Sequence, residues 1–199
     1  MVAAGSGERF GTRKQYQQLG GRRVLDWSLD VARAVSDGVV LVVPVDMVGQ
    51  SEPGADAVVA GGSTRSESVR RGLTVVPADA SAVLVHDAAR PVPLIAVWSR
   101  VVDALRDGAE VAIPVVPITD TVREREGSTL DRDRFVAVQT PQGFRLDVLR
   151  AAHESGAEAT DDASLAEAIG ATVTLVDGDA RNIKITEPWH LALADILVR

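Results

Sequence analysis

The residues best suited to phosphate chemistry gather near the start of the chain, in a glycine-rich stretch that also carries positive charge. Gly5, Gly7 and Gly11 stand close together there, and Arg9 and Lys14 lie among and after them. Glycine lets a backbone approach a ligand closely, and exposed backbone N–H groups can cradle phosphate oxygens. The stretch has neither the glycine-lysine spacing of a P-loop nor the third glycine of a dinucleotide fingerprint. The residues alone leave two interpretations open, a phosphate-binding loop and a structural turn.

A second group of reactive side chains directly follows the apolar run Ala82–Val85, in the order His86, Asp87, Arg90. In open α/β sheets, ligands bind beyond the carboxyl ends of the strands. A carboxylate at that place can hold Mg²⁺, which prefers oxygen ligands and is commonly shared with substrate phosphates. The structural alternative makes Asp87 the cap of the following turn, paired with Arg90. His86 could act as a base, but we expect it to orient Asp87.

The segments that must position these residues alternate between short apolar runs and amphipathic stretches. This alternation is typical of βαβ units, and it predicts an α/β fold with a mainly parallel twisted sheet flanked by helices. The run Val39–Val43 is continuously apolar, as expected for a strand covered on both faces. Further strands are expected at Ala57–Ala60, Ala82–His86, Glu110–Ile113, Thr172–Val176 and Ile183–Thr186.

Helices are predicted where apolar residues recur three and four positions apart, as they do from Leu25 to Val35. Thr64 and Glu67 form a possible capping box before a second helix, whose apolar positions are Val69, Leu73 and Val76. Later helices are expected at Leu94–Asp107, Leu146–Ser155, Asp161–Ile169 and Pro188–Val198.

A charged stretch from Asp120 to Asp133 interrupts the alternation. It lies between two β-prone segments, Val115–Val122 and Phe135–Val138, and its charges alternate in sign ahead of Gly127. This pattern is typical of a projecting hairpin. It is either a solvated loop or an arm that serves in dimerisation or as a lid on the site.

Composition limits the possible partners. The chain has 199 residues, a length that suits one domain. Its 21 Lys and Arg against 28 Asp and Glu give a net charge of −7, which excludes a broadly basic surface for nucleic acid, so positive charge must be concentrated locally. The absence of cysteine excludes disulfides and thiolate chemistry. No signal-peptide pattern or membrane-spanning run is present, and a cytoplasmic protein is expected.

Short motifs along the chain, taken in order, resemble the 2-C-methyl-D-erythritol 4-phosphate cytidylyltransferase family of the non-mevalonate isoprenoid pathway. Each motif alone is weak, but their order and spacing match over nearly the whole chain. The motifs are GSGER to KQ (Gly5–Gln15), GGSTRSESV (Gly61–Val69), VHDAARP (Val85–Pro91), DT (Asp120-Thr121), QTPQGF (Gln139–Phe144), TDDAS (Thr160–Ser164) and NIKIT (Asn182–Thr186).

The resemblance implies one Rossmann-like nucleotidyltransferase domain over residues 1–199, with a dimerisation arm at about 118–136. It also implies that a cytoplasmic homodimer transfers CMP from CTP, with Mg²⁺, to 2-C-methyl-D-erythritol 4-phosphate and releases pyrophosphate. Nucleophile and leaving group are both already anionic. Catalysis then needs positioning and stabilisation of negative charge rather than proton transfer.

The resemblance also assigns roles to individual positions. The assigned residues are Arg9, Lys14 and Lys184 for catalysis; Ala3, Ala4, Gly5 and Gly7 for backbone contacts to the nucleotide; Gly62 and Ser68 for cytosine; Asp87, Arg90 and Thr140, with Lys184, for the substrate phosphate and the metal, Asp87 being the Mg²⁺ contact; and Thr121 and Arg132 for the partner's site.

Three features differ from the usual family pattern. The loop from Arg9 to Lys14 is shorter than in several members of the family. Arg13 stands where proline is usual, which predicts a looser loop before Lys14. Only Met1 and Val2 precede the Ala-Ala-Gly turn, which predicts a very short first strand. Three other functions are considered: a ribitol 5-phosphate cytidylyltransferase, which shares the motifs and the reaction; a CTP-binding module without catalysis; and a hexose-phosphate nucleotidyltransferase, which should be longer.

Overall fold

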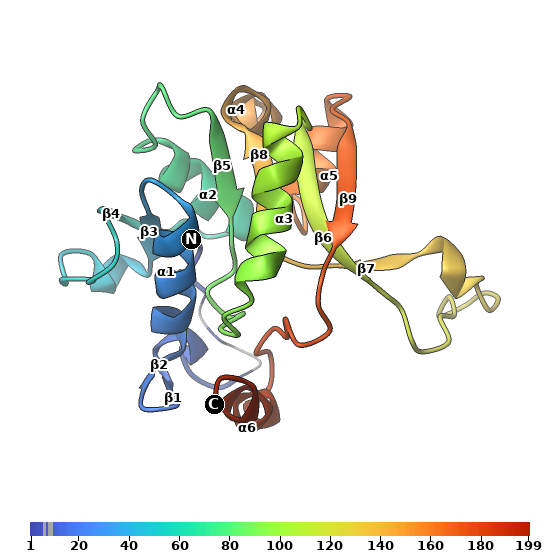
Figure 1. The fold of residues 1–199 in the computed structure, drawn as a ribbon, viewed down its shortest axis with the longest axis horizontal. Helices are drawn as coiled ribbons and strands as arrows, with labels where there is room; N and C mark the ends of the chain where they lie inside the picture. The colour runs from blue at the N-terminus through green and yellow to red at the C-terminus, as the bar shows by residue number, and fades with distance from the viewer. Residues whose placement is uncertain (6, 8–9) are drawn as a thin grey trace.

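A twisted sheet with helices on both faces forms the body of the protein in the computed structural model, which describes residues 1–5, 7 and 10–199 (Figure 1). Within those residues, no helix is both long enough and apolar enough to cross a membrane. The elements are η1 (Lys14–Tyr16), β1 (Gln18–Leu19), β2 (Arg22–Arg23), α1 (Val24–Val35), β3 (Val40–Val43), η2 (Val45–Met47), β4 (Ala57–Ala60), α2 (Arg65–Leu73), β5 (Ala82–Val85), α3 (Ile95–Arg106), β6 (Val111–Pro117), η3 (Arg132–Arg134), β7 (Val136–Val138), β8 (Gln142–Arg145), α4 (Leu146–Glu154), α5 (Asp162–Ala168), β9 (Val173–Asp177) and α6 (Pro188–Leu197).

Most strands of the sheet point the same way. β3 pairs with β4 in parallel and β6 pairs with β9 in parallel, whereas β8 lies antiparallel between β5 and β6. β7 is also antiparallel to β6. The predicted mainly parallel α/β sheet is therefore confirmed, with β7 and β8 as the reversed strands.

The first residues of the chain fill the position between β3 and β5. Val2 forms isolated parallel bridges to Val42 and to Asp87. Its N–H donates to the carbonyl of His86 at 2.8 Å, and the N–H of Ala3 donates to the carbonyl of Val42 at 2.8 Å. The expected very short first strand is thus present as a pair of bridges, and it leads directly into the Ala-Ala-Gly turn.

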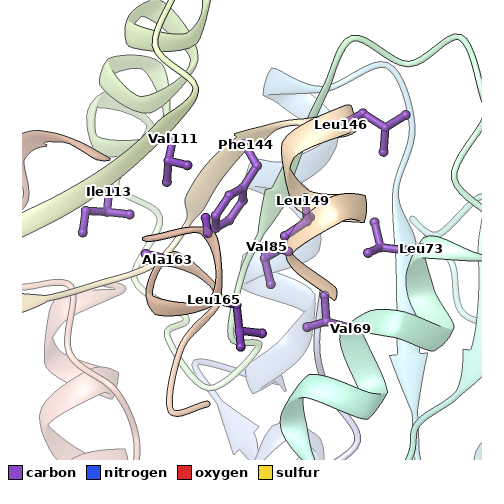
Figure 2. Close-up of a cluster of buried hydrophobic side chains, with 12 residues drawn as sticks. Val69, Leu73, Val85, Val111, Ile113, Phe144, Leu146, Leu149, Ala163 and Leu165 are labelled. Carbon is purple, nitrogen blue, oxygen red and sulfur yellow. The ribbon is translucent and has the colours of Figure 1, made fainter. Parts of the chain in front are cut away.

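Two clusters of buried apolar side chains lie on opposite faces of the sheet. On one face, α1 and α3 contribute Leu25, Leu29 and Trp98, which pack against Leu41. On the other face, α4 and α5 pack against β5, β6 and β8, while α2 packs against α4, β3 and β4. Phe144 lies in the middle of the cluster that these elements share (Figure 2). Because both faces are covered, the strands are apolar without alternation, which explains the continuous run at Val39–Val43.

The charged stretch forms the predicted hairpin. β6 continues beyond Ile113 to Pro117, and its last residues pair with β7, Val115 opposite Val138. A bridge between Arg123 and Thr129 closes the outer part of the hairpin. Figure 1 shows this arm extending away from the body of the protein.

Three details of the expected elements need correction. Ile183–Thr186 is not a strand: the segment runs beside the turn after β5, and its Ile185 N–H donates to the Ala89 carbonyl at 2.8 Å. Its apolar residues signalled burial rather than pairing, since Ile185 is fully buried. Helix α2 ends at Leu73, before Val76. Sequence patterns missed β8, because Gly143 is a poor strand former and the strand has no β-branched residue.

Candidate active site

Three loops meet at the carboxyl edge of the sheet. The Ala3–Gly5 turn follows the first bridges, Gly61 follows β4, and Asp87 follows β5. A Cβ atom at Gly61 would lie 2.2 Å from the Cβ of Ala4, a distance that atoms do not tolerate. Glycine is therefore required at this position for the first two loops to pack together.

Asp87 is held between two cations from distant parts of the chain. Its Oδ2 lies 2.5 Å from Nζ of Lys184, and its Oδ1 lies 3.3 Å from Nε of Arg65. Burial alone would raise the pKa of Asp87, but the charges of Lys184 and Arg65 outweigh it and hold the pKa well below its usual value. Asp87 is thus a carboxylate at neutral pH, and its structural pairing with Arg90, the alternative considered above, is not what the geometry shows.

His86 does not orient the carboxylate of Asp87, contrary to our expectation. Its Nδ1 lies 3.1 Å from Oγ1 of Thr140, and its Nε2 lies 3.2 Å from the carbonyl oxygen of Arg90. Because that carbonyl only accepts, we assign the proton to Nε2, which leaves Nδ1 to accept from the Thr140 hydroxyl. Burial lowers the pKa of His86 to about 3, so the ring is neutral and serves to position Thr140 and the backbone at Arg90.

Thr140 and Arg90 complete this part of the edge. Oγ1 of Thr140 accepts a hydrogen bond from the Asp87 N–H at 3.2 Å. Nη1 of Arg90 donates to the carbonyl of Asn182 at 2.5 Å, close to Lys184 along the chain. The structure therefore brings together Asp87, Arg90, Thr140 and Lys184, as the motifs implied.

The loop between β4 and α2 presents the two residues expected to recognise a base. The Gly62 N–H donates to Oγ of Ser68 at 3.1 Å, and that hydroxyl donates to the carbonyl of Thr64 at 2.8 Å. Oγ1 of Thr64 accepts from the Glu67 N–H at 3.0 Å, as in a capping box, but the Glu67 carboxylate accepts from the N–H of Ser63 instead of Thr64. Gly62 and Ser68 are thus neighbours on one rigid turn.

The N-terminal loop is described in part, and Arg9 lies outside the described residues. The side-chain amide of Gln15 donates to the carbonyls of Ala3 at 2.6 Å and Gly5 at 3.1 Å, which fixes the start of the loop. Gly7 has φ of +77°, and a Cβ there would lie 1.8 Å from the carbonyl oxygen of Thr12. Only glycine fits that turn.

Lys14 begins η1, and the residue before it is held by an ion pair. The two Nη atoms of Arg13 each lie 2.8 Å from an oxygen of Asp46. Arg13 has φ of −72°, a value within the range that a proline ring would impose. The expected loosening before Lys14 is therefore opposed by a two-pronged contact in place of a ring.

Thr121 and Arg132 are not brought to this edge within one chain. Both lie on the projecting arm between β6 and β7, where a guanidinium nitrogen of Arg132 donates to the carbonyl of Thr119. A role for them in a site requires that the arm of one chain reach another chain's edge.

Sequence reasoning gave no role to Arg65 or Asp162, although both fall inside motifs that it singled out. Nη1 of Arg65 lies 2.7 Å from Oδ2 of Asp162, and Oδ1 of Asp162 lies 3.0 Å from Nε2 of His153. Asp162 has no exposed surface. A buried carboxylate implies a partner, but the sequence does not show that Asp162 is buried, nor which arginine it meets.

The donor set fits a divalent cation only if the substrate supplies most of its ligands. In the part of the chain that the structure describes, no three Asp, Glu, His or Cys side chains come together as a metal cluster. Asp87 offers one carboxylate at the strand end, and Mg²⁺ is commonly held by one or two carboxylates with phosphate oxygens and water. The residues therefore fit a cation that is shared with a nucleotide triphosphate.

The fold and this edge define a class: α/β proteins that gather cationic side chains beyond the sheet to hold an anionic ligand. The chain belongs to the 2-C-methyl-D-erythritol 4-phosphate cytidylyltransferase family, IspD, whose sequence model matches residues 1–199. It is similar to the 2-C-methyl-D-erythritol 4-phosphate cytidylyltransferase of Frankia casuarinae, with 46% identity over 98% of this chain and 79% of that protein.

Other relatives agree in sequence and in fold. The enzyme of the same name from Rhodococcus jostii is 42% identical, over 98% of this chain and 92% of that protein. The crystal structure of 2-C-methyl-D-erythritol 4-phosphate cytidylyltransferase from Thermus thermophilus has 39% identity and a TM-score of 0.86, covering 100% of this chain and 97% of that one. The chain spans about half (56%) of the bifunctional enzyme IspD/IspF of Nitratidesulfovibrio vulgaris.

Proposed function

We propose that this protein transfers CMP from CTP to 2-C-methyl-D-erythritol 4-phosphate and releases pyrophosphate, a step in making isoprenoid precursors. The observation that carries the proposal is the Asp87 carboxylate, held between Lys184 and Arg65 at the sheet edge of a chain that matches this family from end to end. The ribitol phosphate enzyme and the CTP-binding module share parts of this site, but the family match does not favour them.

The chemistry follows from the charges at the edge. An oxygen of the acceptor phosphate forms a bond to the α-phosphorus of CTP, and the bond to pyrophosphate breaks. Lys184, as an ammonium beside Asp87, attracts the incoming phosphate, and Lys14 and Arg9 act on the triphosphate as its charge redistributes. Preorganised cations of this kind act mainly by stabilising charge that develops in the transition state.

Mg²⁺ belongs to this proposal as the family's metal. When bound, it would neutralise charge on the triphosphate and help to orient it. Asp87 is the residue that would hold it. Lys184 and Arg65 keep that carboxylate ionised, as a metal ligand must be.

The nucleotide would lie along the two loops that meet at Gly61. Backbone groups of the turn from Ala3 to Gly7 would follow the phosphates, and Gly62 with Ser68 would select cytosine. Support comes from the close packing of Ala4 against Gly61, which places both loops at one edge.

The arm would complete the site of a second copy, so that the protein works as a homodimer. The arm exposes apolar side chains, with Phe135 and Val136 42% and 41% exposed. A second chain would cover them and receive Thr121 and Arg132. We further infer one domain over residues 1–199, with its arm at about 118–136, in the cytoplasm and without a nucleic-acid or membrane partner.

The test is pyrophosphate release with CTP and Mg²⁺, with methylerythritol phosphate and ribitol 5-phosphate offered in parallel. Turnover with methylerythritol phosphate is expected. Preference for ribitol 5-phosphate would favour the second enzyme, and CTP binding without turnover of either acceptor would leave the binding module.

A further inference from the structure

We propose that Arg65 is a positioning residue, which fixes Asp87, and through it Lys184, by tying them to the buried carboxylate of Asp162. The inference rests on the proposed function, because Asp87 and Lys184 are the residues proposed to bind the metal and the acceptor phosphate. It assigns a task to a residue whose side chain contacts the carboxylates of Asp87 and Asp162.

The geometry supports this because one guanidinium spans two carboxylates. Nε of Arg65 faces Oδ1 of Asp87 at 3.3 Å, and Nη1 faces Oδ2 of Asp162 at 2.7 Å. Arginine presents its donors in a rigid planar fork, so the position of one carboxylate determines where the other can lie. Lysine, with one charged atom, cannot hold both in this way.

The far end of the bridge is itself immobilised. The second oxygen of Asp162 meets Nε2 of His153 at 3.0 Å, and the Asp162 N–H donates to Oε1 of Gln142 at 3.2 Å. Asp162 lies at the start of α5, between α4 and the sheet, with no exposed surface. Arg65 is thus held against the core through Asp162, and its contact with Asp87 restricts the position of that carboxylate as well.

The Asp87 end of this bridge needs a contact that fixes the carboxylate. The other cation on Asp87 is Lys184, whose side chain is 40% exposed and which lies outside any helix or strand. A flexible ammonium does not by itself fix the plane of a carboxylate. With Arg65 on Oδ1, only one orientation of Asp87 leaves Oδ2 for Lys184, so the ammonium is placed as well.

The sequence offers a direct reporter, since Lys14 and Lys184 are its only lysines. Protein labelled with ¹³C at lysine Cε should give two lysine signals, which Lys14→Arg assigns. The variants are Asp162→Asn, Arg65→Lys and the double Arg65→Gln/Asp162→Asn, which leaves no lone buried carboxylate. Arg70→Gln is the control. Arg70 stands on α2, as Arg65 does, and this substitution removes its ion pair with Glu158.

We expect Asp162→Asn and the double variant to move the Lys184 signal and leave that of Lys14 in place. In steady state, kcat per folded molecule should fall about 10–100-fold, as for loss of a residue that supports a ligand. The KM for CTP should change less than about twofold, because the nucleotide loops are untouched. Arg65→Lys should retain more of kcat than the double variant does. Arg70→Gln should have the same kcat and the same Lys184 signal as the unaltered protein.

An unmoved Lys184 signal in folded Asp162→Asn would overturn the inference, as would kcat per folded molecule equal to that of the unaltered protein. A rise in the KM for CTP that accounts for the whole loss would place Arg65 on the nucleotide and overturn it too. If the unaltered protein releases no pyrophosphate, the proposed function fails, and the Lys184 signal still decides the role of Arg65.

Discussion

Two regions carry the cations that are assigned to the site, and they are held in different ways. At the strand ends, Lys184 is fixed by Asp87 and, behind it, by the partly buried Arg65 and the fully buried carboxylate of Asp162. At the N-terminal loop, the segment before Lys14 is fixed by the Gln15 amide and by an exposed ion pair between Arg13 and Asp46.

The difference concerns how much free energy holds each cation in place. Breaking a buried ion pair leaves an uncompensated charge and costs several kcal/mol, on the order of 3–5. An exposed pair contributes roughly 0–1 kcal/mol, because water competes for both partners. The strand-end contacts should therefore resist disruption more strongly than the exposed Arg13–Asp46 pair of the N-terminal loop.

The largest effect should come from removing the strand-end cation. Lys184→Ala should lower kcat roughly 10²–10³-fold, since it removes a preorganised charge from the reacting phosphates. Lys184→Arg is the matched variant that retains charge but changes its shape. Pyrophosphate release measures both, and a near-normal rate for Lys184→Ala would reverse the comparison in favour of the loop.

The arm tests whether the strand-end side is complete within one chain. Arg132→Ala and Lys184→Ala should each be nearly inactive alone, yet mixing them with subunit exchange should restore activity. In mixed dimers one of the two sites receives an intact arm and an intact edge, so about a quarter of all sites should recover. No recovery, with exchange confirmed by mass spectrometry, would show that each chain completes its own site.

Acid should weaken the buried edge through His86. Burial lowers the pKa of its imidazole from 6.5 to about 3, so between these values the unfolded chain binds a proton that the folded chain does not. The contribution to stability is present above about pH 6.5 and is lost as the pH falls toward 3. As the pH falls from about 6.5 toward 3, the free energy of unfolding should decrease less steeply in His86→Asn than in the unaltered protein, by up to about 1.4 kcal/mol per pH unit. Denaturant unfolding at several pH values measures this difference. Parallel slopes would contradict this.

The smallest effect should come from the tether of the loop. Arg13→Ala should change kcat/KM for CTP only a few-fold, because the pair with Asp46 is exposed. Arg13→Pro should retain activity, since φ of −72° suits proline and the Arg13 amide donates to no described residue. In that background Asp46→Ala should have no further effect. A large loss from Arg13→Ala would show that this loop is as firmly built as the strand ends.

Much of the fold was accessible from the sequence because its signals are local. The apolar run at Val39–Val43, the spacing from Leu25 to Val35 and the glycine turn in the charged arm each predicted an element that is present. The errors arose where the burial of a segment did not coincide with its pairing in the sheet. Ile183–Thr186 is buried without being a strand, and β8 is a strand without β-branched residues.

For the site, the family resemblance carried by the motifs implied that Asp87, Thr140 and Lys184 would meet, and they do. The partners of these residues were not predictable. Arg65 and Asp162 are 97 positions apart, as are Asp87 and Lys184, and no local pattern encodes which charges will share a buried space.

The sequence by itself determined most of the elements, the family and the residue types at the edge, because periodicity, glycine and charge act over a few neighbouring positions. Only the tertiary structure decided that His86 is neutral and holds Thr140, and that Asp87 is tied through Arg65 to the core. The physical reason is that burial and charge pairing depend on distances through space, which exist only once the chain has folded.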